Sequence, residues 1–529
     1  MGILERAVFL RTSRQLCSLS TSPRNQLQHQ NSNLDNALVL FERNPSVINV
    51  SSWNKLLSRC VRSNQIQAAE YLFDKMPVKD IVTWNTMLSA FKKTKNPDLV
   101  CKYFFGLQEI GLMPCERTVA ILLSAFSDAA YSVLVPQIHV LVVCLGLKLS
   151  VFVGSALIRA YASAGDHFAL GRVFDEIAEK NVASWNALIS GYMELGCMVK
   201  AQRVFDVMPE KDMISWTNLV HGYIVNKRID KARTMFDKMD KRDVVSWTVM
   251  ISGYVQDESY TKALKLFRFM VDSGTRPNDF TFSCVLDACS GCSSLLMGQQ
   301  VHSIILKSGI PGNVYLWTSL FNMYGKCGEI DAAYSIFESM EIKNLVSWNS
   351  IIGCYARHGL PTRALAEFER LIKCGVIPDQ ITFINVLSAC AHGGLVTEGE
   401  KHFESMSINY GIEAELEHYT CMVDLYGRAG QLEKAEKLIK EMPFMPDVVL
   451  WGALLGACGL HSSLELGEFA AEGIRKMEKD HPIAYSMLSK IHGEREQWTN
   501  IIELRKIMKE RGVRNQKAGS WIESPVDVS

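Results

Sequence analysis

The sequence predicts an all-α fold, a right-handed superhelical solenoid built of stacked helical hairpins. Three observations predict it: a tryptophan-centred phrase recurs at regular spacing, a second apolar stripe of helical period follows each copy, and no Pro-, Ser- or acid-rich linker divides the 529 residues. Hydrophobic residues make up 48% of the chain and charged residues 21%. This composition supports a continuous apolar core and is too apolar for a disordered chain.

The tryptophan phrase marks the start of a repeated unit. Eight of the ten tryptophans open such a phrase, for example VTWNTML at Trp84 and VSWNSII at Trp348. The other six are Trp53, Trp185, Trp216, Trp247, Trp317 and Trp451. Their separations of 31, 101, 31, 31, 70, 31 and 103 residues divide into units of 31 to 36 residues, and units without tryptophan begin with aligned phrases such as TFSCVLDAC. About twelve units therefore cover residues 50–447.

Each unit is expected to form two helices. A serine or threonine stands directly before most of these tryptophans, as at Ser52, Thr83 and Ser347, where its hydroxyl suits the N-cap of the first helix. The second helix carries Ala, Phe and Met or Leu at i, i+4 and i+7, which places them on one face. These triplets are Ala69, Phe73, Met76; Ala201, Phe205, Met208; Ala232, Phe236, Met239; Ala263, Phe267, Met270; and Ala364, Phe368, Leu371. One hairpin cannot bury such a face, so the units must stack and the Trp and Phe stripes are predicted to be core.

The repeated motif VSWNxxIxGY...A...F..M, in units of 31 and 35 residues, resembles the PLS subclass of the plant organellar pentatricopeptide-repeat (PPR) family. The run EHYTCMVDLYGRAGQLEKAEKLIKEMPFMPDVVLWGALLGAC and the terminal GSWIE are similar to its last repeats and E motifs, so the resemblance covers residues 50 to about 524. Tetratricopeptide repeats fit less well because they keep a constant period of about 34 residues. The resemblance implies a single-stranded RNA-binding solenoid in which two side chains of each repeat, on the concave face, contact one base.

The resemblance assigns these two side chains to fixed positions. The first follows the tryptophan position, and the second is the last residue of the unit. The pairs are Asn54 with Asp80, Asn85 with Cys115, Ser155 with Asn181, Asn186 with Asp212, Thr217 with Asp243, Thr248 with Asn278, Thr318 with Asn344, Asn349 with Asp379 and Thr420 with Asp447. Three L-type units offer Ala120 with Ser150, Ser283 with Asn313 and Ile384 with Glu415, which carry little or no base specificity in the family.

By the same resemblance, Asn–Asp pairs select U, Asn–Cys selects a pyrimidine weakly, Thr–Asp selects G, and Thr–Asn or Ser–Asn selects A. An Asn amide suits a pyrimidine edge and a hydroxyl suits a purine, while the terminal Asp or Asn completes the discrimination. Repeats of the family run along RNA from 5′ to 3′, and the last S-type repeat lies four nucleotides before an edited cytidine. The implied target is 5′-UYNAUGANAUNGNNNC-3′, least certain at its 5′ end because Cys115 replaces the usual Asp or Asn and the unit from Val151 lacks its tryptophan.

A simpler interpretation is that Asn, Thr and Asp are merely good residues for a helix start. That interpretation predicts polar residues anywhere in the turn, whereas the sequence confines them to one position between apolar neighbours. The polar pairs therefore favour RNA binding over a protein-binding scaffold, and the E motifs favour a site-recognition factor for C-to-U editing over an RNA stability or splicing factor. Lys and Arg (56) equal Asp and Glu (56), so RNA binding must use a local groove.

No catalytic site, metal site or cofactor is predicted. The zinc deaminases need H-x-E followed by P-C-x-x-C, and only the first half is present, at His402, Phe403 and Glu404. Cys289 and Cys292 form a lone CxxC without a second pair, and no phosphate-binding loop or complete catalytic triad appears. Editing would therefore need a deaminase-bearing partner, for which the E-type helical motifs of residues 448–515 are the expected docking module. Their alternative role is a cap of the solenoid.

The ends of the chain have separate predictions. Residues 1–30 are Arg-, Ser- and Thr-rich with one acid, Glu5, which is typical of a transit peptide for the mitochondrion, with the plastid or a disordered cytosolic tail as alternatives. Residues 31–49 resemble half a repeat that caps the N-terminus, and residues 516–529 form a tail. The apolar stretch from Val135 to Gly154 is interrupted by polar residues, so no membrane span is expected.

Overall fold

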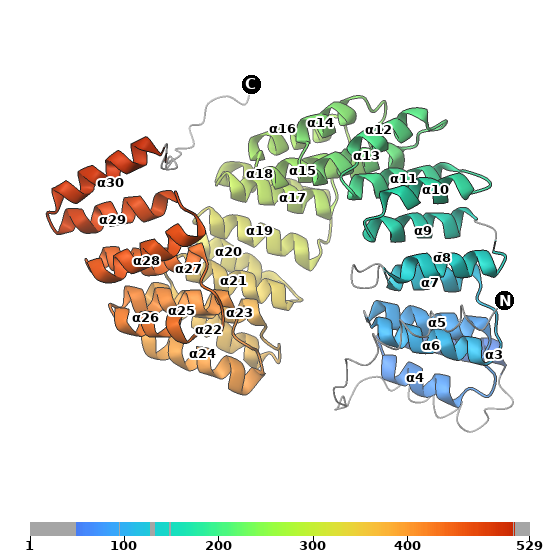
Figure 1. Cartoon of the computed structure of the whole chain (residues 1–529), viewed down its shortest axis with the longest axis horizontal. Coiled ribbons are helices and arrows are strands. Elements are labelled where there is room, and N and C mark those ends of the chain that lie inside the picture. The colour runs from blue at the N-terminus through green and yellow to red at the C-terminus, as the bar shows by residue number, and fades with distance from the viewer. Residues whose placement is uncertain (1–48, 95, 127–132, 148–149, 512, 514–529) are drawn as a thin grey trace. The chain divides into compact units, whose positions relative to one another are not determined.

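The computed structural model describes residues 49–94, 96–126, 133–147, 150–511 and 513, and in these residues it contains 28 α-helices and no strand (Figure 1). The helix bounds are α3 Val50–Arg62, α4 Ile66–Lys75, α5 Ile81–Lys93, α6 Pro97–Glu109, α7 Glu116–Ala125, α8 Leu134–Cys144, α9 Val151–Ser163, α10 His167–Glu176, α11 Val182–Glu194, α12 Met198–Val207, α13 Met213–Val225, α14 Ile229–Asp237, α15 Val244–Gln256, α16 Tyr260–Asp272, α17 Asp279–Gly291, α18 Leu295–Ser308, α19 Val314–Lys326, α20 Ile330–Ser339, α21 Leu345–Arg357, α22 Pro361–Lys373, α23 Gln380–Gly393, α24 Val396–Tyr410, α25 Leu416–Arg428, α26 Leu432–Glu441, α27 Val448–Leu460, α28 Leu464–Met477, α29 Pro482–Glu494 and α30 Trp498–Glu510. Consecutive helices pair into hairpins, twelve from α3 to α26 and two from α27 to α30. The described residues divide into two compact units, one up to residue 253 and one from residue 254 onward, and each is described by itself.

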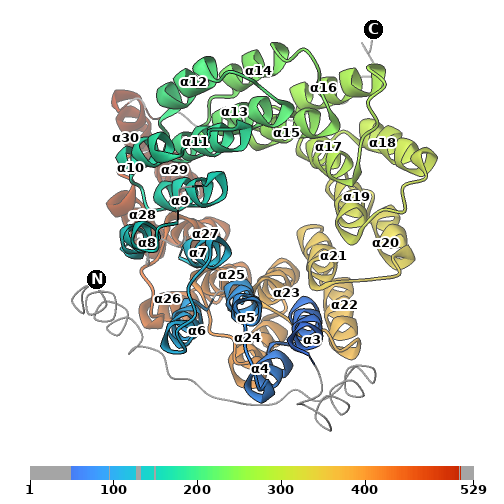
Figure 2. The ribbon, with the colours of Figure 1, turned by 90° about the vertical axis from the view of Figure 1, so that its right-hand side faces the viewer.

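Within each unit the hairpins stack in chain order. In the first unit α11 contacts α9, α12 and α13, and in the second unit α23 contacts α21, α24 and α25. Figure 2 shows two layers in each unit: α9, α11 and α13 lie in one layer with α10, α12 and α14 in the other, and α19 and α21 lie in one layer with α20 and α22 in the other. The predicted fold class, an all-α helical repeat solenoid, is confirmed for these residues.

The first helices whose N-cap was predicted at the Ser or Thr before a Trp begin three residues earlier than the sequence pattern predicts. In α5 the N-cap is Asp80, whose carboxylate accepts the backbone N–H of Thr83, and the Thr83 side chain in turn accepts the N–H of Asp80. Thr83, predicted as the N-cap, is therefore the third residue of the helix. The same reciprocal arrangement is present at Asp212 with Ser215. The prediction was wrong because a hydroxyl at either end of this capping arrangement satisfies a free backbone amide.

The predicted apolar stripes of the second helices are confirmed as core. Ala69, Phe73 and Met76 are 5% exposed or less, and the other four triplets are equally well buried. The Phe of each stripe packs edge-on against an aromatic ring near the start of the next unit, which is Trp in three cases and Phe after Phe267 and Phe368. The ring centroids of Phe205 and Trp216, for example, lie 4.7 Å apart. This aromatic contact joins successive hairpins and is worth about 0.5–1.5 kcal/mol beyond its buried area.

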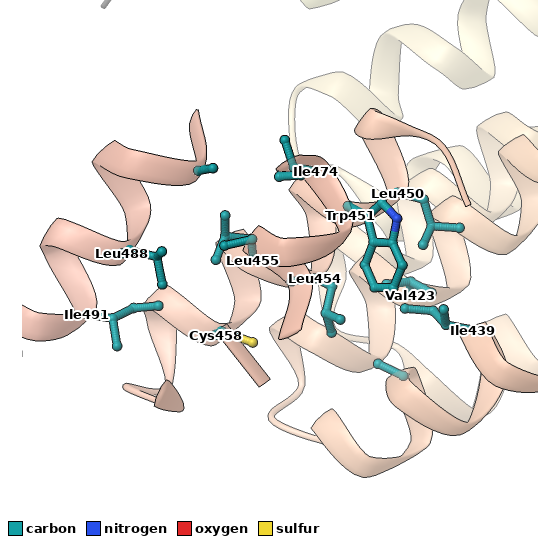
Figure 3. Packing of buried hydrophobic residues seen from close by; sticks show 14 of the residues in the cluster. Val423, Ile439, Leu450, Trp451, Leu454, Leu455, Cys458, Ile474, Leu488 and Ile491 are labelled. Carbon is teal, nitrogen blue, oxygen red and sulfur yellow. The ribbon is translucent and has the colours of Figure 1, made fainter. Parts of the chain in front are cut away.

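The hairpins after residue 447 continue the same packing. Their core includes Ile439 of α26, Trp451 and Leu455 of α27, Ile474 of α28 and Ile491 of α29 (Figure 3). α27 contacts α25 just as α25 contacts α23. The change from repeat to terminal hairpin therefore involves no change in the way the helices pack.

Several sequence predictions fall outside the described residues. They are the transit peptide of residues 1–30, almost all of the half repeat of residues 31–49, the GSWIE segment and the tail of residues 516–529. None of the described helices combines the length and the apolar character that crossing a membrane requires. The fourteen cysteines in the described part of the chain are all free thiols.

Candidate nucleic-acid interface

The structure places the two predicted side chains of each pair at equivalent points. The first is always the fifth residue of a first helix, such as Asn54 in α3 or Thr217 in α13. The second precedes the next first helix, where its side chain accepts a backbone N–H from the first turn, as Asp80 and Asp447 do. The two positions of one pair thus come from consecutive units. The capping role explains why Asp and Asn recur at the second position, and it leaves the second carboxylate oxygen of each Asp for another donor.

The four pairs whose first member is Asn are joined directly by hydrogen bonds. The Nδ2 group of Asn54 donates to Asp80 Oδ1 at 3.0 Å, and that of Asn349 donates to Asp379 Oδ1 at 2.9 Å. Asn186 Nδ2 donates to Asp212 Oδ1 at 3.3 Å, and Asn85 Nδ2 donates to Cys115 Sγ at 3.4 Å. Each of these four Asn side chains is at least nine-tenths buried.

The Thr-containing pairs have a different geometry. The hydroxyls of Thr217, Thr318 and Thr420 donate to the backbone carbonyl four residues earlier in their own helix, at 2.8, 2.6 and 2.9 Å. The hydroxyl of Thr248 does the same toward Val244 at 2.6 Å. The hydroxyl proton is thereby occupied, so toward any other group the oxygen can act only as an acceptor. Among the described residues, the buried hydroxyl of Ser155 has no hydrogen-bond partner.

The Asp side chains of the Asn–Asp pairs are held ionised. Burial raises the pKa of the Asp80 carboxyl, but hydrogen bonds from the Thr83 backbone, the Asn54 amide and the Thr83 hydroxyl outweigh burial and place the pKa below its ordinary value. The pKa values of Asp212 and Asp379 are lowered for the same reasons. Each of these carboxylates is therefore an acceptor at neutral pH, with no proton of its own to donate.

Cys115 occupies the same N-cap position with a thiol. Burial raises its pKa, but hydrogen bonds from the Thr118 side chain, the Thr118 backbone and the Asn85 amide together lower the pKa below that of an ordinary thiol. The sulfur is thus a partial analogue of the Asp carboxylate, with one acceptor atom in place of two.

The pairs of the three L-type units occupy the same positions. Ser150, Asn313 and Glu415 are the N-caps of α9, α19 and α25. The fifth residues of the preceding first helices, α7, α17 and α23, are Ala120, Ser283 and Ile384. Of these, Ala120 and Ile384 have no polar side chain to offer a base. The architecture is therefore kept where the fifth residue is apolar.

A row of exposed apolar side chains was missed by sequence reasoning. The second residue of most first helices is apolar and 51–69% exposed, although it lies in a helix that is otherwise well packed. These residues are Val82, Phe152, Ile214, Val245, Phe280, Tyr315, Val346 and Ile381. Each lies three residues before the fifth position and hence on the same helical face. The sequence did contain a signal for these residues, namely an apolar residue three positions before the first member of most polar pairs. It was missed because apolar residues in these helices were all interpreted as core.

Two hollows in the surface coincide with predicted pair residues. In the first unit, an open cavity of about 630 Å³ is lined by Asn181, Asn186 and Asp212, with Arg159 and Ile214 at its sides. In the second unit, a smaller cavity of about 320 Å³ is lined by Thr420 together with residues of α23, α25 and α27. The polar pairs thus border accessible space at both places.

Cations near this face are unevenly distributed. The last turns of the first helices α3, α5, α19, α21 and α25 carry basic residues, among them Arg62, Lys93, Lys326 and Arg357. The last turns of α9, α11, α13 and α17 carry none. Basic residues therefore occur in the last turns of some first helices and not of others.

The two potential zinc motifs are not assembled into a metal site. His402 lies on α24, where its ring packs edge-on against Phe368 with centroids 5.3 Å apart. Cys289 is buried in α17, and Cys292 follows that helix. In the described part of the chain, no three His, Cys, Asp or Glu side chains are grouped so that they could hold a metal ion.

Comparison with protein-family models gives matches along most of the chain. The PPR repeat model matches residues 51–81, 82–112, 183–213, 214–244, 315–345, 346–376 and 417–444. A second model, described as PPR repeat family, matches residues 242–291, and the E motif model matches residues 461–523. The matched repeats each begin near the start of a first helix.

Curated relatives come from Arabidopsis thaliana. One pentatricopeptide repeat-containing protein is 34% identical over 471 residues, which is 89% of this chain and 69% of the relative. Another, named as mitochondrial, is 36% identical over 458 residues, 87% of this chain and 63% of the relative. Other relatives are longer, and the chain spans about half of their length.

Among solved structures, the crystal structure of the pentatricopeptide repeat protein PPR10 in complex with an 18-nucleotide psaJ RNA element is similar. The TM-score is 0.58 at 16% sequence identity, and the match covers 92% of this chain and 83% of the other. At this identity the likeness concerns the fold.

Proposed function

This chain belongs to the pentatricopeptide repeat family, and we propose that it binds one stretch of single-stranded RNA and marks a cytidine in it for C-to-U editing. The observation that carries the proposal is the repetition of a polar pair, the fifth residue of one first helix and the N-cap before the next, in ten of twelve units. Nine of these pairs are assigned to a base, and the tenth, Ser283 with Asn313, belongs to an L-type unit. Packing alone requires neither residue type at the fifth position, since Ala120 and Ile384 occupy it in units of the same architecture.

The geometry of the Asn–Asp pairs suits uracil. One Nδ2 hydrogen of Asn349 is used by Asp379 Oδ1, which leaves the other as a donor, and Asp379 keeps its Oδ2 as an acceptor. Uracil offers a carbonyl acceptor beside its N3–H donor, so both groups are satisfied together. Cytosine has an acceptor at N3, which would face a carboxylate. The pairs at Asn54, Asn186 and Asn349 are therefore assigned to U.

The remaining pairs complete the target. The Thr–Asp pairs are assigned to G, the Thr–Asn and Ser–Asn pairs to A, and the Asn85–Cys115 pair to a pyrimidine. The proposed site is 5′-UYNAUGANAUNGNNNC-3′, in which the final C is the edited base. The exposed apolar residues of the first turns would contact the faces of the bases, and the basic last turns would contact phosphates.

The editing reaction itself is assigned to a partner. We propose that a deaminase-bearing protein and other editing factors dock on the terminal hairpins, residues 448–515, without metal or cofactor in this chain. Trp498 and Ile502 lie one turn apart on α30 and are 64% and 67% exposed. Such a pair of large apolar side chains fits an interface better than a plain cap. An RNA stability or splicing role would use the same pairs without this surface.

The proposed compartment is the mitochondrion, with the plastid as the alternative. The Arg-rich, acid-poor residues 1–30 support import, and one of the relatives is named as mitochondrial.

Binding to a synthetic RNA tests the proposal. The chain from residue 31 onward is titrated with the 16-nucleotide target and with targets carrying A or U at the sixth base, opposite Thr217 and Asp243. Binding should weaken by a factor of about five to a hundred on either change, as for one mismatched position. The variant Thr217→Asn should regain affinity for U at that base. Equal binding to scrambled RNA would refute the proposal in favour of a protein-binding scaffold.

A further inference from the structure

We infer that a buried hydroxyl next to each Asn–Asp pair sets how strictly that pair distinguishes U from C. The hydroxyl belongs to the third residue of the helix that begins directly after the Asp. The inference rests on the proposed function and adds a third residue to each pair. The residues are Thr83 behind Asn54, Ser215 behind Asn186 and Thr382 behind Asn349. All three are 0% exposed, so they cannot touch RNA and act only by positioning the Asn.

In the pair of Asn349 and Asp379, the hydroxyl fixes the amide. Thr382 Oγ1 lies 2.6 Å from Asn349 Oδ1 and 2.7 Å from Asp379 Oδ1, but it has one proton. Asp379 Oδ1 already accepts the Thr382 backbone N–H at 2.9 Å and the Asn349 amide at 2.9 Å. In the described part of the chain, the Thr382 hydroxyl is the one side-chain donor recorded for Asn349 Oδ1. The proton therefore goes to Asn349, whose amide then has only one orientation that satisfies both of its ends.

The pair of Asn54 and Asp80 repeats this geometry. Thr83 Oγ1 lies 2.7 Å from Asn54 Oδ1, and Asn54 Nδ2 lies 3.0 Å from Asp80 Oδ1. The Asn85 amide is held in the same way, because the Thr118 hydroxyl lies 2.8 Å from its Oδ1 atom. A threonine in the third position thus accompanies a fixed amide in three units.

The pair of Asn186 and Asp212 differs because serine takes the place of threonine. The Ser215 hydroxyl lies 2.7 Å from Asp212 Oδ1. Asn186 Oδ1 is buried and has no hydrogen-bond partner among the described residues, and its Nδ2 contact to Asp212 is the longest of the three, at 3.3 Å. Serine lacks the methyl group that restricts χ1 of threonine, so its hydroxyl is free to turn away from the Asn. The Asn186 amide is therefore held at one end only.

The two kinds of amide present different groups to a base. A fixed amide offers its second N–H, a donor, which suits uracil beside the Asp acceptor. An amide held only through Nδ2 is fixed less firmly. When it rotates, it gives up the weak bond to Asp212 and offers Oδ1, an acceptor, which suits the amino group of cytosine. The unit of Asn349 should then reject C more strongly than the unit of Asn186, although both pairs consist of Asn and Asp.

Reciprocal substitutions test the inference. The full-length chain and its variants Ser215→Thr and Thr382→Ser are titrated with targets carrying U or C at the fifth or the tenth base. Ser215→Thr should raise the U-over-C preference at the fifth base, and Thr382→Ser should lower it at the tenth, each by about two- to tenfold, the factor of one neutral hydrogen bond. Both hydroxyls keep the helix start capped, so the change in thermal melting should be no larger than one buried methyl group accounts for, about 0.5–1.5 kcal/mol.

Ser246→Thr is the matched control. Ser246 is equally buried, but it stands behind Thr217, whose hydroxyl donates to its own helix, so there is no amide to fix. Preference at the sixth base should stay the same. If U is preferred over C at both bases but neither variant changes the ratio, the inference is wrong and the proposed function stands. If the parent chain shows no base preference at all, the proposed function fails, and the inference with it.

Discussion

The hairpins from α3 to α26 and the terminal hairpins α27 to α30 are built in the same way but differ in the surface they present. In both regions first helices pack on first helices, and the exposed apolar residue of the first turn persists, as Val449 in α27 and Ile483 in α29 show. The polar pair does not persist. The fifth residues of α27 and α29 are Gly452 and Ser486, and the N-cap between them is His481.

This difference distinguishes the residues that build the solenoid from the residues that would recognise RNA. Apolar stripes, edge-on aromatic contacts and N-caps are shared by both regions and account for folding. The pairs of Asn or Thr with an acidic or amide N-cap occur in the array only, within the described residues. Substitutions at the fifth position of the pairs should thus alter recognition with little effect on stability, and substitutions on the terminal surface should alter neither.

The largest expected effect is the loss of editing when the terminal surface is changed. Replacing Trp498 and Ile502 together with Glu should reduce editing of the target cytidine to background, because a charged surface would no longer fit an apolar partner. Affinity for the RNA should change by less than about twofold, as is usual for exposed positions. Editing is measured by sequencing the transcript in a line that lacks the endogenous protein and carries the variant.

The control for this variant is a similar pair on the array. Val199 and Val207 of α12 are 66% and 67% exposed, so Glu at both positions introduces the same charge on an equally exposed surface. Editing should be retained. Editing that survives the change at Trp498 and Ile502 would indicate that the terminal hairpins are only a cap.

A second prediction is that a pair can be installed in the terminal hairpins. Gly452→Asn with His481→Asp places an Asn–Asp pair at the next position of the row, beside Val449. Space for the side chain is open at Gly452, and Asp can accept the backbone N–H of Ile483 that His481 accepts now. Affinity should be about two- to tenfold higher for a target with U than for one with C at the thirteenth base. The preference should stay modest, because the third residue of α29 is Ala484, which has no hydroxyl to fix the amide. Gly452→Asn alone should show no such preference, since its partner would lack a carboxylate.

The third prediction concerns the weak pair of the array. Cys115→Asp should convert the Asn85 unit into one like the Asn54 unit, because the amide is already held by Thr118 and needs only a second acceptor oxygen. Preference for U over C at the second base should increase by about two- to tenfold. Fluorescence anisotropy with the two RNAs measures the ratio, and an unchanged ratio would show that the N-cap residue has no part in selection.

The smallest expected effect is a pH dependence of the preference for U over C at the same base. The pKa of the Cys115 thiol is lowered in the folded chain, so the thiolate and its hydrogen bonds stabilise the folded form increasingly as the pH rises through that lowered pKa, and this stabilisation is lost as the pH falls. U preference at the second base should accordingly increase modestly from neutral to alkaline pH. Cys115→Asp should abolish this dependence, since a carboxylate stays ionised over the whole range.

Much of the fold follows from the sequence because its determinants are periodic. The spacing of Trp53 and its equivalents and the Ala–Phe–Met triplets identify the hairpins and their buried faces. The start of each first helix was displaced because Thr83 and Asp80 are both residues that suit an N-cap, and only the backbone geometry distinguishes them.

The candidate site was predictable in part. The resemblance placed the pairs, and the structure puts both members at fixed points of consecutive units. The exposure of Val82 and its equivalents was not predictable, since an apolar residue in a helix is more often buried. Nor was the contact of Thr382 with Asn349, because it joins residues 33 positions apart and depends on the rotamer of a buried side chain.

The central claim is that base selection repeats with the hairpins, and a substitution scan of the RNA tests it most directly. Each of the first twelve bases of the target is replaced in turn, and the affinity of the full-length chain is measured at fixed salt. The account predicts a loss at nine bases and none at the third, eighth and eleventh, which face the units of Ala120, Ser283 and Ile384. A uniform response along the RNA, or losses at those three bases, would contradict it.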